Sequence, residues 1–299
     1  DLNTWRVDGF VKNGYVFDAD LGTSIGIIAS ASYHNQQNTY GPRQWNASQT
    51  NAYLNAIFQT MFDDSATDMW DDHEHKLSAG LSVNYDRYNE YLSFGTNTPS
   101  PNYIYGEVTS GIFAEYTYTY QDKVTLLAGV REDYSSHYGF FTTPRMNLRY
   151  APFDWWTVRG SIGLGYRSPN AIADNAAYLA SNRMYYAYDR VSDNGYGIMD
   201  GILAQERSMN TGFSTVFYIP LGKRELQLSG EYYYTKFLDG VIADMDRNLH
   251  GITLYNMHDV EGAQYFSHNW QVEANMEILR GWTMTAAFRY TDVKQTTFN

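Results

Sequence analysis

The sequence predicts an all-β protein, a segment of a transmembrane antiparallel β-barrel with about twelve strands. Three observations support this fold class: apolar and polar residues alternate along long segments, aromatic residues make up 17% of the chain with 28 Tyr and 7 Trp, and the connections are of two lengths. The alternation explains a mean hydropathy of only -0.48, because one face of each strand would meet lipid and the other water.

Twelve segments of the chain show the period of two that is typical of half-buried strands. The clearest is His75 to Tyr85, where Leu77, Ala79 and Leu81 alternate with small and polar residues. In chain order the predicted strands are 4–13, 20–33, 51–62, 75–85, 111–120, 124–131, 145–150, 157–167, 206–219, 226–233, 271–278 and 284–290. Several exceed ten residues, the length that a tilted strand needs to cross a bilayer.

The connections between these segments alternate between short and long. Tight turns are predicted at 120–123, 151–154, 221–223 and 280–281, and long loops at 34–50, 93–110, 168–205 and 239–263. Outer-membrane barrels have short turns on the periplasmic side and long loops outside. Two connections do not follow the rule, since 135–138 is short where a long loop is expected and 63–74 is long where a turn is expected.

Other protein classes explain these features less well. A soluble β-sandwich or propeller has strands of about 5–6 residues, and no stretch approaches the ~20 apolar residues of a spanning helix. Aromatic residues also flank the predicted short turns, as at Tyr120, Trp155 and Trp282. A net charge of -12 argues against nucleic acid as a partner, and the absence of Cys excludes a disulfide framework.

The second half of the chain carries motifs in a recognisable order. Thr143–Pro152 is followed by Arg159–Asn170, which contains Gly-x-Gly-Tyr-Arg and Ser-Pro-Asn, and further matches are Glu206 with Asn210 and Gly212, Glu231–Thr235, Val241–Asp244 and Arg280-Gly281-Trp282. These motifs resemble the barrel of TonB-dependent outer-membrane receptors, and their sequences are most similar to those of receptors from Bacteroides-like bacteria. The resemblance covers most of residues 110 to 299, whereas residues 1 to 109 match only in strand pattern.

The resemblance implies a 22-stranded barrel plugged by an N-terminal globular domain. We therefore expect residues 1–299 to be one partial transmembrane barrel domain, with the plug domain and the C-terminal strands absent from this sequence. The implied partners are the TonB–ExbB–ExbD energy-coupling complex, acting through the missing plug, and the lipids and lipopolysaccharide of the bacterial outer membrane. A surface lipoprotein and a small-molecule or glycan ligand also belong to the implied set.

Five arginines project from the polar faces of neighbouring predicted strands: Arg131, Arg145, Arg149, Arg159 and Arg167. We interpret them as a lumen wall that pairs with carboxylates of the plug, because the guanidinium group suits carboxylate pairing. The alternative is solvated lumen charge that Glu273 and Glu277 offset.

The long loop from Asn170 to Gln205 is the best candidate for ligand capture, because rigid aromatic side chains and arginine form contact surfaces. Covering the barrel mouth or touching lipopolysaccharide is an equally good interpretation of this loop. The candidate ligand-binding residues are Tyr178, Arg183, Tyr185, Tyr186, Tyr188 and Arg190.

No catalytic residue, metal site or cofactor is predicted. Asp71-Asp72-His73-Glu74-His75 holds side chains that can bind metals, but a solvated acidic loop is the default for such a run. Ser267 and His268 resemble a hydrolase pair only superficially, because adjacent residues of a strand point to opposite faces.

The predicted function is energised import of a scarce ligand, which the resemblance suggests is an iron chelate, haem, cobalamin or a glycan. Iron-type chelates are favoured by family frequency alone. The alternatives are an outer-membrane barrel enzyme of the lipase or protease type, which needs a catalytic triad or dyad near one rim, and a passive porin or adhesive surface barrel, which needs no plug.

Overall fold

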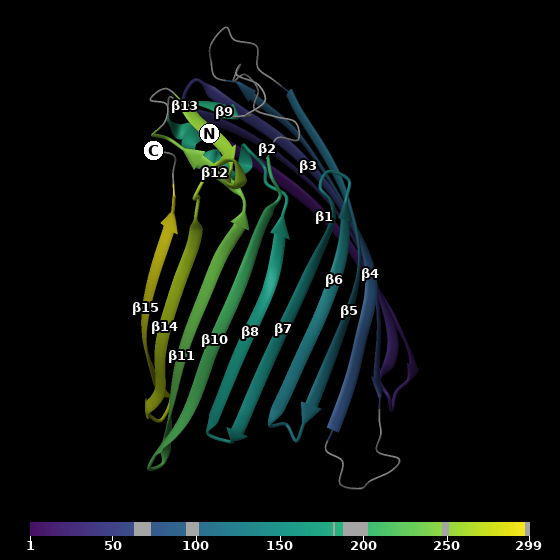
Figure 1. The fold of residues 1–299 in the computed structure, drawn as a ribbon, viewed down its shortest axis with the longest axis vertical. Helices are drawn as coiled ribbons and strands as arrows, with labels where there is room; N and C mark the ends of the chain where they lie inside the picture. Colours follow the sequence, from purple (N-terminus) through teal and green to yellow (C-terminus); the bar gives the residue numbers. More distant parts are fainter. Residues whose placement is uncertain (63–72, 94–101, 182, 188–202, 247–250, 297–299) are drawn as a thin grey trace.

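The computed structural model describes residues 1–62, 73–93, 102–181, 183–187, 203–246 and 251–296. Twelve strands form one large antiparallel sheet in which each strand pairs with the next (Figure 1). They are β1 (Leu2–Asp18), β2 (Thr23–Tyr40), β3 (Arg43–Phe62), β4 (His73–Ser93), β5 (Asn102–Tyr120), β6 (Val124–Ser135), β7 (Gly139–Phe153), β8 (Trp156–Arg167), β10 (Glu206–Leu221), β11 (Arg224–Asp239), β14 (Tyr265–Leu279) and β15 (Trp282–Gln295). All twelve segments that the alternation predicts as strands lie in this sheet.

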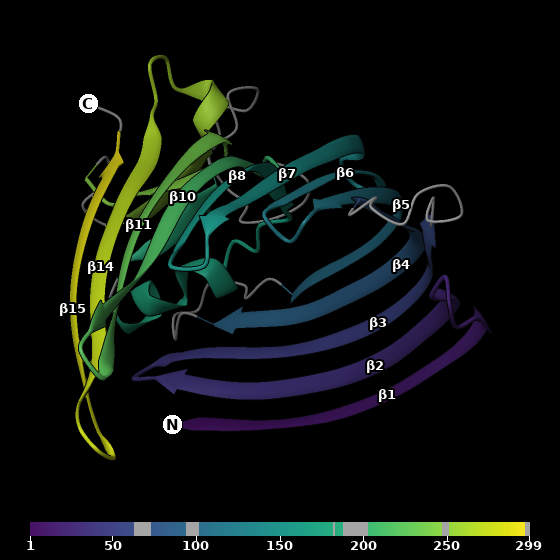
Figure 2. The same ribbon diagram turned by 90° about the horizontal axis from the view of Figure 1, so that it is seen from below.

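The large sheet curves, and several short elements lie on its concave side (Figure 2). They are the 3-10 helix η1 (Ala173–Ala180) and the strands β9 (Met184–Ala187), β12 (Val241–Asp244) and β13 (Gly251–Asn256). The 3-10 turn η2 (Met257–Asp259) follows β13 in the chain. β13 pairs with β12 in antiparallel and with β9 in parallel fashion. We call η1, β9, β12 and β13 the inner cap, and the end of the sheet where they lie the cap rim.

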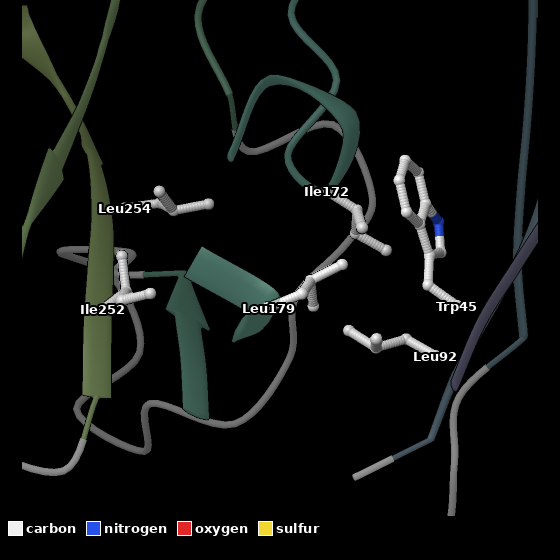
Figure 3. Close-up of a cluster of buried hydrophobic side chains, with 6 residues drawn as sticks. All are labelled: Trp45, Leu92, Ile172, Leu179, Ile252 and Leu254. Atoms are coloured by element: carbon white, nitrogen blue, oxygen red, sulfur yellow. The ribbon is translucent and has the colours of Figure 1, made fainter. Parts of the chain in front are cut away.

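The inner cap packs against the concave face of the large sheet, which we call the wall, through a small hydrophobic core (Figure 3). Trp45 of β3 and Leu92 of β4 meet Ile172 and Leu179 around η1 and two residues of β13, Ile252 and Leu254. Leu92, Ile252 and Leu254 are fully buried. Burial of each such aliphatic side chain contributes about 1.5–3 kcal/mol, so the core holds the cap to β3 and β4.

The two faces of the sheet differ in chemistry, and the strand registers show which residues share a face, because directly paired residues point the same way. Arg167 of β8 contacts Asp174 of the cap, so its face is the inner one. Ile162 and Leu164 are an odd number of residues from Arg167 in β8, so they are on the outer face. The registers of the neighbouring strands place Phe213, Val272 and Phe288 on the same outer face. Phe213, Val272 and Phe288 are each at least half exposed, as lipid-facing side chains must be.

The end of the sheet opposite the cap carries tight turns. The connections at 121–123, 154–155, 222–223 and 280–281 each join two strands of the sheet, which confirms the four predicted short turns. On the cap rim, Ser135 and Gly139 also bound a tight turn between β6 and β7. The connection 63–72 lies outside the described residues. We call the end opposite the cap the short-turn rim.

Two of the predicted long loops are wrong in extent. The segment 34–50 is strand rather than loop: β2 and β3 pair up to Tyr40 and Arg43 around a two-residue turn, where Gly41 has a φ of +60°. A strand that extends beyond the bilayer meets water on both faces, so its polar residues need not alternate with apolar ones. The loop predicted at 93–110 is also shorter, because β5 starts at Asn102, and 94–101 lie outside the described residues.

The loops predicted at 168–205 and 239–263 do connect β8 to β10 and β11 to β14, but they contain the inner cap. Within the described ranges, no helix is both long enough and apolar enough to cross a membrane.

Candidate functional site

The five predicted lumen arginines share the inner face of the sheet. Arg149 and Arg159 are directly paired across β7 and β8. Arg167 is eight residues from Arg159 in β8, and because this number is even the two side chains point to the same face. Arg145 pairs with Gly129 on β6, two residues from Arg131. The alternation therefore placed all five guanidinium groups on one continuous wall, the wall that carries the inner cap.

Two of these arginines already have partners within the wall. Arg131 binds its strand neighbour Asp133 through Nε at 2.6 Å and donates to Ser82 of β4 at 2.7 Å. Arg145 forms an ion pair with Glu115 of β5. Their charges are offset by carboxylates of the barrel itself.

Arg149 and Arg159 differ from the other three. Arg149 donates to the backbone oxygen of Asp122 at 2.6 Å, and in the described part of the chain no carboxylate forms an ion pair with either Arg149 or Arg159. The two side chains line a cavity of about 300 Å³. Glu273 and Glu277, the expected counter-charges, lie on β14, which is three strands from Arg159 of β8 and four from Arg149 of β7. In the described residues they form no ion pair with these arginines.

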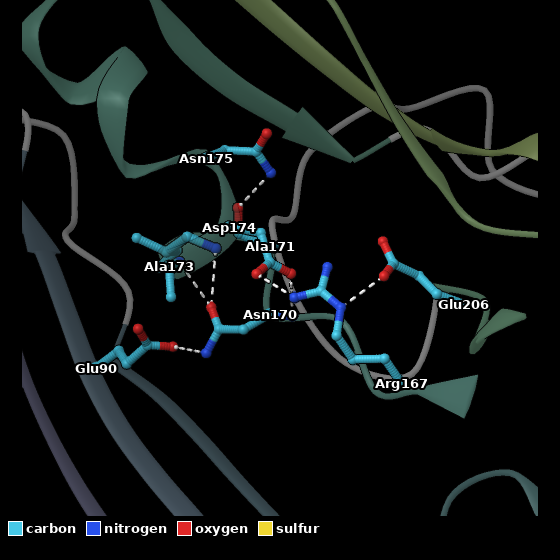
Figure 4. A network of polar contacts seen from close by, with 9 residues as sticks. Glu90, Arg167, Asn170, Ala171, Ala173, Asp174, Asn175 and Glu206 are labelled. Atoms are coloured by element: carbon cyan, nitrogen blue, oxygen red, sulfur yellow. Dashed lines mark hydrogen bonds and ion pairs between the residues drawn. The ribbon is translucent and has the colours of Figure 1, made fainter. Parts of the chain in front are cut away.

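Arg167 joins the end of β8 to the start of β10 and to the cap (Figure 4). Its Nε donates to Glu206 at 2.6 Å and its Nη1 to Asp174 of η1 at 2.7 Å. Asp174 also accepts from the backbone N–H of Asn170 at 2.9 Å. The guanidinium group thus fixes the direction in which the chain leaves the wall and turns inward.

A second polar anchor ties the same segment to the opposite part of the wall (Figure 4). Glu90 of β4 is 1% exposed. It accepts from Asn170 Nδ2 at 3.0 Å and from Trp45 Nε1 at 3.2 Å. The start of the cap connection is therefore held from two sides, by hydrogen bonds to Arg167 of β8 and to Glu90 of β4, as well as by the apolar core of the cap.

The cap and the wall enclose two cavities on the inner face. The larger, of about 440 Å³, is lined by Arg167 of β8, by Asn170, Asp174 and Tyr178 of the β8–β10 connection, and by Glu206 and parts of β11 and β12. It lies between two long connections close to the cap rim, and its lining combines charged and polar groups with apolar side chains such as Phe237 and Val241.

The smaller cavity, of about 210 Å³, is lined by three tyrosine rings and two carboxylates from β4 and β5: Tyr88, Tyr103, Tyr105, Asp86 and Glu107. Tyr105 donates to Glu107 at 2.8 Å, and Ser168, beside the cap, donates to Glu107 at 3.1 Å. Sequence reasoning missed this cavity because it searched the loops for ligand contacts. A signal is nevertheless present in the sequence, because Asn84, Asp86 and Tyr88 alternate along β4 on the face that the alternation assigns to the lumen.

Tyr138 of the β6–β7 turn closes the cap rim beside these cavities. Burial raises the pKa of its phenol, and the nearby charge of Glu107 raises the pKa further. Its hydroxyl donates to the backbone oxygen of Leu203 at 3.3 Å. The phenol therefore remains neutral and acts as a hydrogen-bond donor to the segment that precedes β10.

The predicted ligand-binding residues fall into three groups. Tyr178, on η1, packs against the core of the cap and lines the larger cavity. Arg183 donates to the backbone oxygen of Met245 at 2.7 Å, and Tyr185 and Tyr186 form the parallel ladder of β9 with β13. Tyr188 and Arg190 lie outside the described residues. The described part of the loop, residues 170–181, 183–187 and 203–205, is thus folded inward over the wall.

The histidine motifs lie in strands. His73 and His75 begin β4 on the outer face, where His73 Nδ1 lies 2.6 Å from the hydroxyl of Tyr118 and His75 contacts Tyr116, so the loop expected there is wrong for His73 to His75. Asp71 and Asp72 lie outside the described residues. Within the described residues, no group of three potential metal ligands occurs. Ser267 and His268 are consecutive residues of β14 and so face opposite sides of the sheet.

Several comparisons with known proteins agree with this architecture. A family model described as "TonB dependent receptor-like, beta-barrel" matches residues 2–299. No curated protein matches the sequence. Among solved structures, the siderophore receptor PirA from Pseudomonas aeruginosa aligns with a TM-score of 0.58 at 14% identity, over 99% of this chain and 54% of that one.

Two further solved structures have the same fold. BauA, the ferric preacinetobactin receptor from Acinetobacter baumannii, gives a TM-score of 0.64 at 13% identity, with 99% of this chain and 46% of that one covered. The copper transporter OprC gives 0.61 at 12% identity, with 97% and 46% covered. The chain therefore spans about half the length of these proteins.

The family consists of receptors and transporters rather than enzymes, and its barrels lie in the outer membrane of Gram-negative bacteria. With the match spanning 2–299 and a sheet of twelve antiparallel strands, this chain belongs to the TonB-dependent receptor-like β-barrel family and is a portion of such a barrel in the outer membrane.

Proposed function

We propose that the protein imports a scarce ligand across the outer membrane as a TonB-coupled receptor, of which this chain forms the ligand-facing wall. The observation that carries the proposal is the inner cap, two long connections folded against a polar wall and enclosing cavities of about 440 and 210 Å³. The cap rim faces the outside, because long connections are extracellular in such barrels.

Ligand capture is assigned to the larger cavity and to the connection that lines it. Tyr178, Arg183, Tyr185, Tyr186, Tyr188 and Arg190 supply the aromatic and cationic contacts in this proposal. Tyr178 already lines the cavity, and the Arg167 and Glu90 anchors hold the start of the connection in place. Because the start of the connection is already fixed, less conformational entropy is lost when the ligand binds.

Docking of the plug is assigned to Arg149 and Arg159. Like charges that face each other directly across two strands are destabilising, so the pair favours a carboxylate from another segment. The cavity between the two side chains has room for such a group, since its volume is about 300 Å³. The remaining barrel strands would cover the free edges of β1 and β15, because exposed sheet edges are not tolerated in lipid.

The energy for release comes from the inner-membrane complex that contains TonB, through the plug, so the barrel catalyses no chemistry in this proposal. Iron-type chelates are the first ligands to test. The similar structures include receptors described as binding siderophores and a copper transporter, and haem, cobalamin and glycans remain alternatives.

The proposal is tested by growth of a strain that lacks the gene, supplied with a single source of iron or cobalamin at limiting concentration. Growth on at least one chelate should fail and should return with the wild-type gene. A Tyr178→Ala gene should restore it only at higher ligand concentration, because one aromatic contact is lost. Normal uptake of every iron compound and of cobalamin would contradict the chelate assignment.

A further inference from the structure

Two carboxylates face each other directly across β4 and β5, on the inner face beside the cap. Asp86 and Glu107 are Cα partners in the register of these two strands, and both line the smaller cavity, of about 210 Å³. Like charges at directly opposite positions of a sheet are destabilising. The pair therefore favours a positive charge close to both groups.

Neither carboxylate is neutralised by the part of the chain that the structure describes. Within that part, Asp86 accepts hydrogen bonds from side-chain amides and Glu107, which is 7% exposed, accepts them from hydroxyls. The amides belong to Gln49, Asn51 and Asn84, and the hydroxyls to Tyr105, Ser135 and Ser168. Neutral donors favour the charged form of a carboxylate without cancelling its charge. No basic side chain of the described residues forms an ion pair with either group, so both charges remain available to a ligand.

Three tyrosine rings adjoin the two carboxylates. Tyr88 and Tyr105 are Cα partners with ring centroids 6.2 Å apart, and the centroid of Tyr103 lies 6.1 Å from that of Tyr105. All three rings line the cavity, and none of the described residues that line it is basic. The face of an aromatic ring attracts a cation within about 6 Å. The rings and the carboxylates therefore attract the same sign of charge.

The hydrogen bonds that the carboxylates already make narrow the kind of ligand that fits. A carboxylate has about four lone-pair sites. Oδ1 of Asp86 and Oε1 of Glu107 each accept two hydrogen bonds, and Oδ2 and Oε2 each accept one. A calcium ion needs about six to eight oxygen ligands, and a sugar needs acceptors for several hydroxyls. The sites that remain suit neither of these, whereas an ammonium group gains from the negative charge and from the rings.

We propose that the smaller cavity binds an ammonium group, primary or quaternary, carried by the imported ligand. Asp86 and Glu107 supply the counter-charge, and Tyr105 supplies an aromatic face. Ser168 and Asn170 of the β8–β10 connection also line the cavity, so the cation is held between the wall and the start of the cap. The inference rests on the proposed function for the source of the cation, and it selects ligands with an amine over purely anionic chelates.

The test measures dissociation constants for the full-length receptor in detergent by ligand-observed NMR. The probes are choline, dimethylbutanol in which carbon replaces the charged nitrogen, glucose and calcium. Choline should bind about tenfold more tightly than dimethylbutanol, because charged groups strengthen hydrogen bonds and ion pairs by about that factor. Glucose and calcium should each bind more weakly than choline.

The double variant Asp86→Asn/Glu107→Gln retains the shape and an acceptor oxygen at each position, and it should bind choline no more tightly than dimethylbutanol. Tyr105→Leu should bind choline about fivefold more weakly, because the aromatic face is lost. Tyr105→Phe retains the ring and should bind choline as the wild type does. The matched control is Asp154→Asn/Glu225→Gln, the same two changes at exposed positions of the short-turn rim, which should leave choline binding unchanged.

Equal affinity of the wild type for choline and dimethylbutanol would overturn the proposal. Wild-type affinity for choline in Asp86→Asn/Glu107→Gln, or tighter binding of glucose or calcium than of choline, would also overturn it. Growth on limiting sources of iron and cobalamin is measured with the same variants. A receptor that binds choline as expected but restores no growth would contradict the proposed import and leave the cation site intact, so the two failures are distinguished.

Discussion

Single residues of the inner face show how closely the strands approach one another. A Cβ atom at Gly80 would lie 2.4 Å from the backbone oxygen of Ala56 and 2.7 Å from the ring of Phe113. The backbone oxygen belongs to the neighbouring strand and cannot move aside without disturbing the ladder. Glycine is thus required at position 80 by packing.

Gly80→Ala should therefore lower the free energy of unfolding by about 1–3 kcal/mol, the usual cost of overpacking. Gly160→Ala is the matched control, since Gly160 is also a mid-strand position and a Cβ there meets nothing within 4 Å. Urea unfolding of the full-length protein from lipid vesicles measures both changes. Equal stability of the two variants would show that β3, β4 and β5 are packed differently.

The second prediction at this scale concerns the proposed docking of the plug at Arg149 and Arg159. Arg159→Glu should let the two side chains pair with each other and repel a plug carboxylate, so the plug should seat less firmly. We expect increased entry of a large antibiotic that the outer membrane normally excludes, measured as growth inhibition.

The control for this prediction is Arg280→Glu, the same charge reversal at an exposed arginine of the short-turn rim. Its antibiotic sensitivity should match the wild type. If Arg159→Glu also behaves as the wild type while the protein is present at normal levels, the arginine pair has no part in seating the plug.

Among the elements, the inner cap depends on contacts between segments that are far apart in sequence. Glu90→Ala would leave Trp45 Nε1 and Asn170 Nδ2 without their acceptor, at about 1–3 kcal/mol for each buried unpaired group. We expect faster backbone hydrogen exchange around Asn170 and η1, with the twelve-stranded sheet unchanged. Glu90→Gln, which retains one acceptor oxygen, should show a smaller change.

The control variant is Glu225→Ala, at an exposed carboxylate near the short-turn rim, which should leave exchange at η1 unchanged. Unchanged exchange in Glu90→Ala would mean that the apolar core alone holds the cap.

How far the elements can be predicted from sequence depends on the distance over which their signals act. The twelve strands and the four short turns are local features, because alternation and turn chemistry lie within ten residues. The turn at Gly41 was missed because the outer ends of β2 and β3 are wetted on both faces and do not alternate. The parallel pairing of β9 with β13 joins residues 67 apart, such as Met184 and Gly251, and no local pattern encodes it.

The candidate site follows the same division. The shared face of the five arginines follows from period two alone. Which carboxylate each arginine meets does not, since Arg167 reaches Glu206 across 39 residues and Asn170 reaches Glu90 across 80. The cavity between β4, β5 and the cap also arises only when these segments are folded together.

For the molecule as a whole, the central claim is that the outer face meets lipid and the inner face meets water. The spacing of the aromatic residues agrees with a bilayer. Trp282 and Tyr290 are both on the outer face of β15, eight residues or about 27 Å apart along the strand. Because barrel strands are tilted by about 35–45°, this distance is roughly 19–22 Å along the membrane normal, close to the apolar band of about 25 Å in outer-membrane barrels. The two rings therefore lie near the opposite edges of that band.

The most direct test of this claim is cysteine scanning along β14. This chain contains no Cys, and any Cys elsewhere in the full-length protein is replaced by Ser. Single cysteines at Gln271, Val272, Glu273, Ala274, Asn275 and Met276 are introduced into the full-length protein in native membranes. A water-soluble maleimide should label positions 271, 273 and 275 and a lipid-soluble maleimide 272, 274 and 276, in strict alternation. Equal labelling of all six positions by the water-soluble reagent would contradict the claim, because it would place both faces of the strand in water.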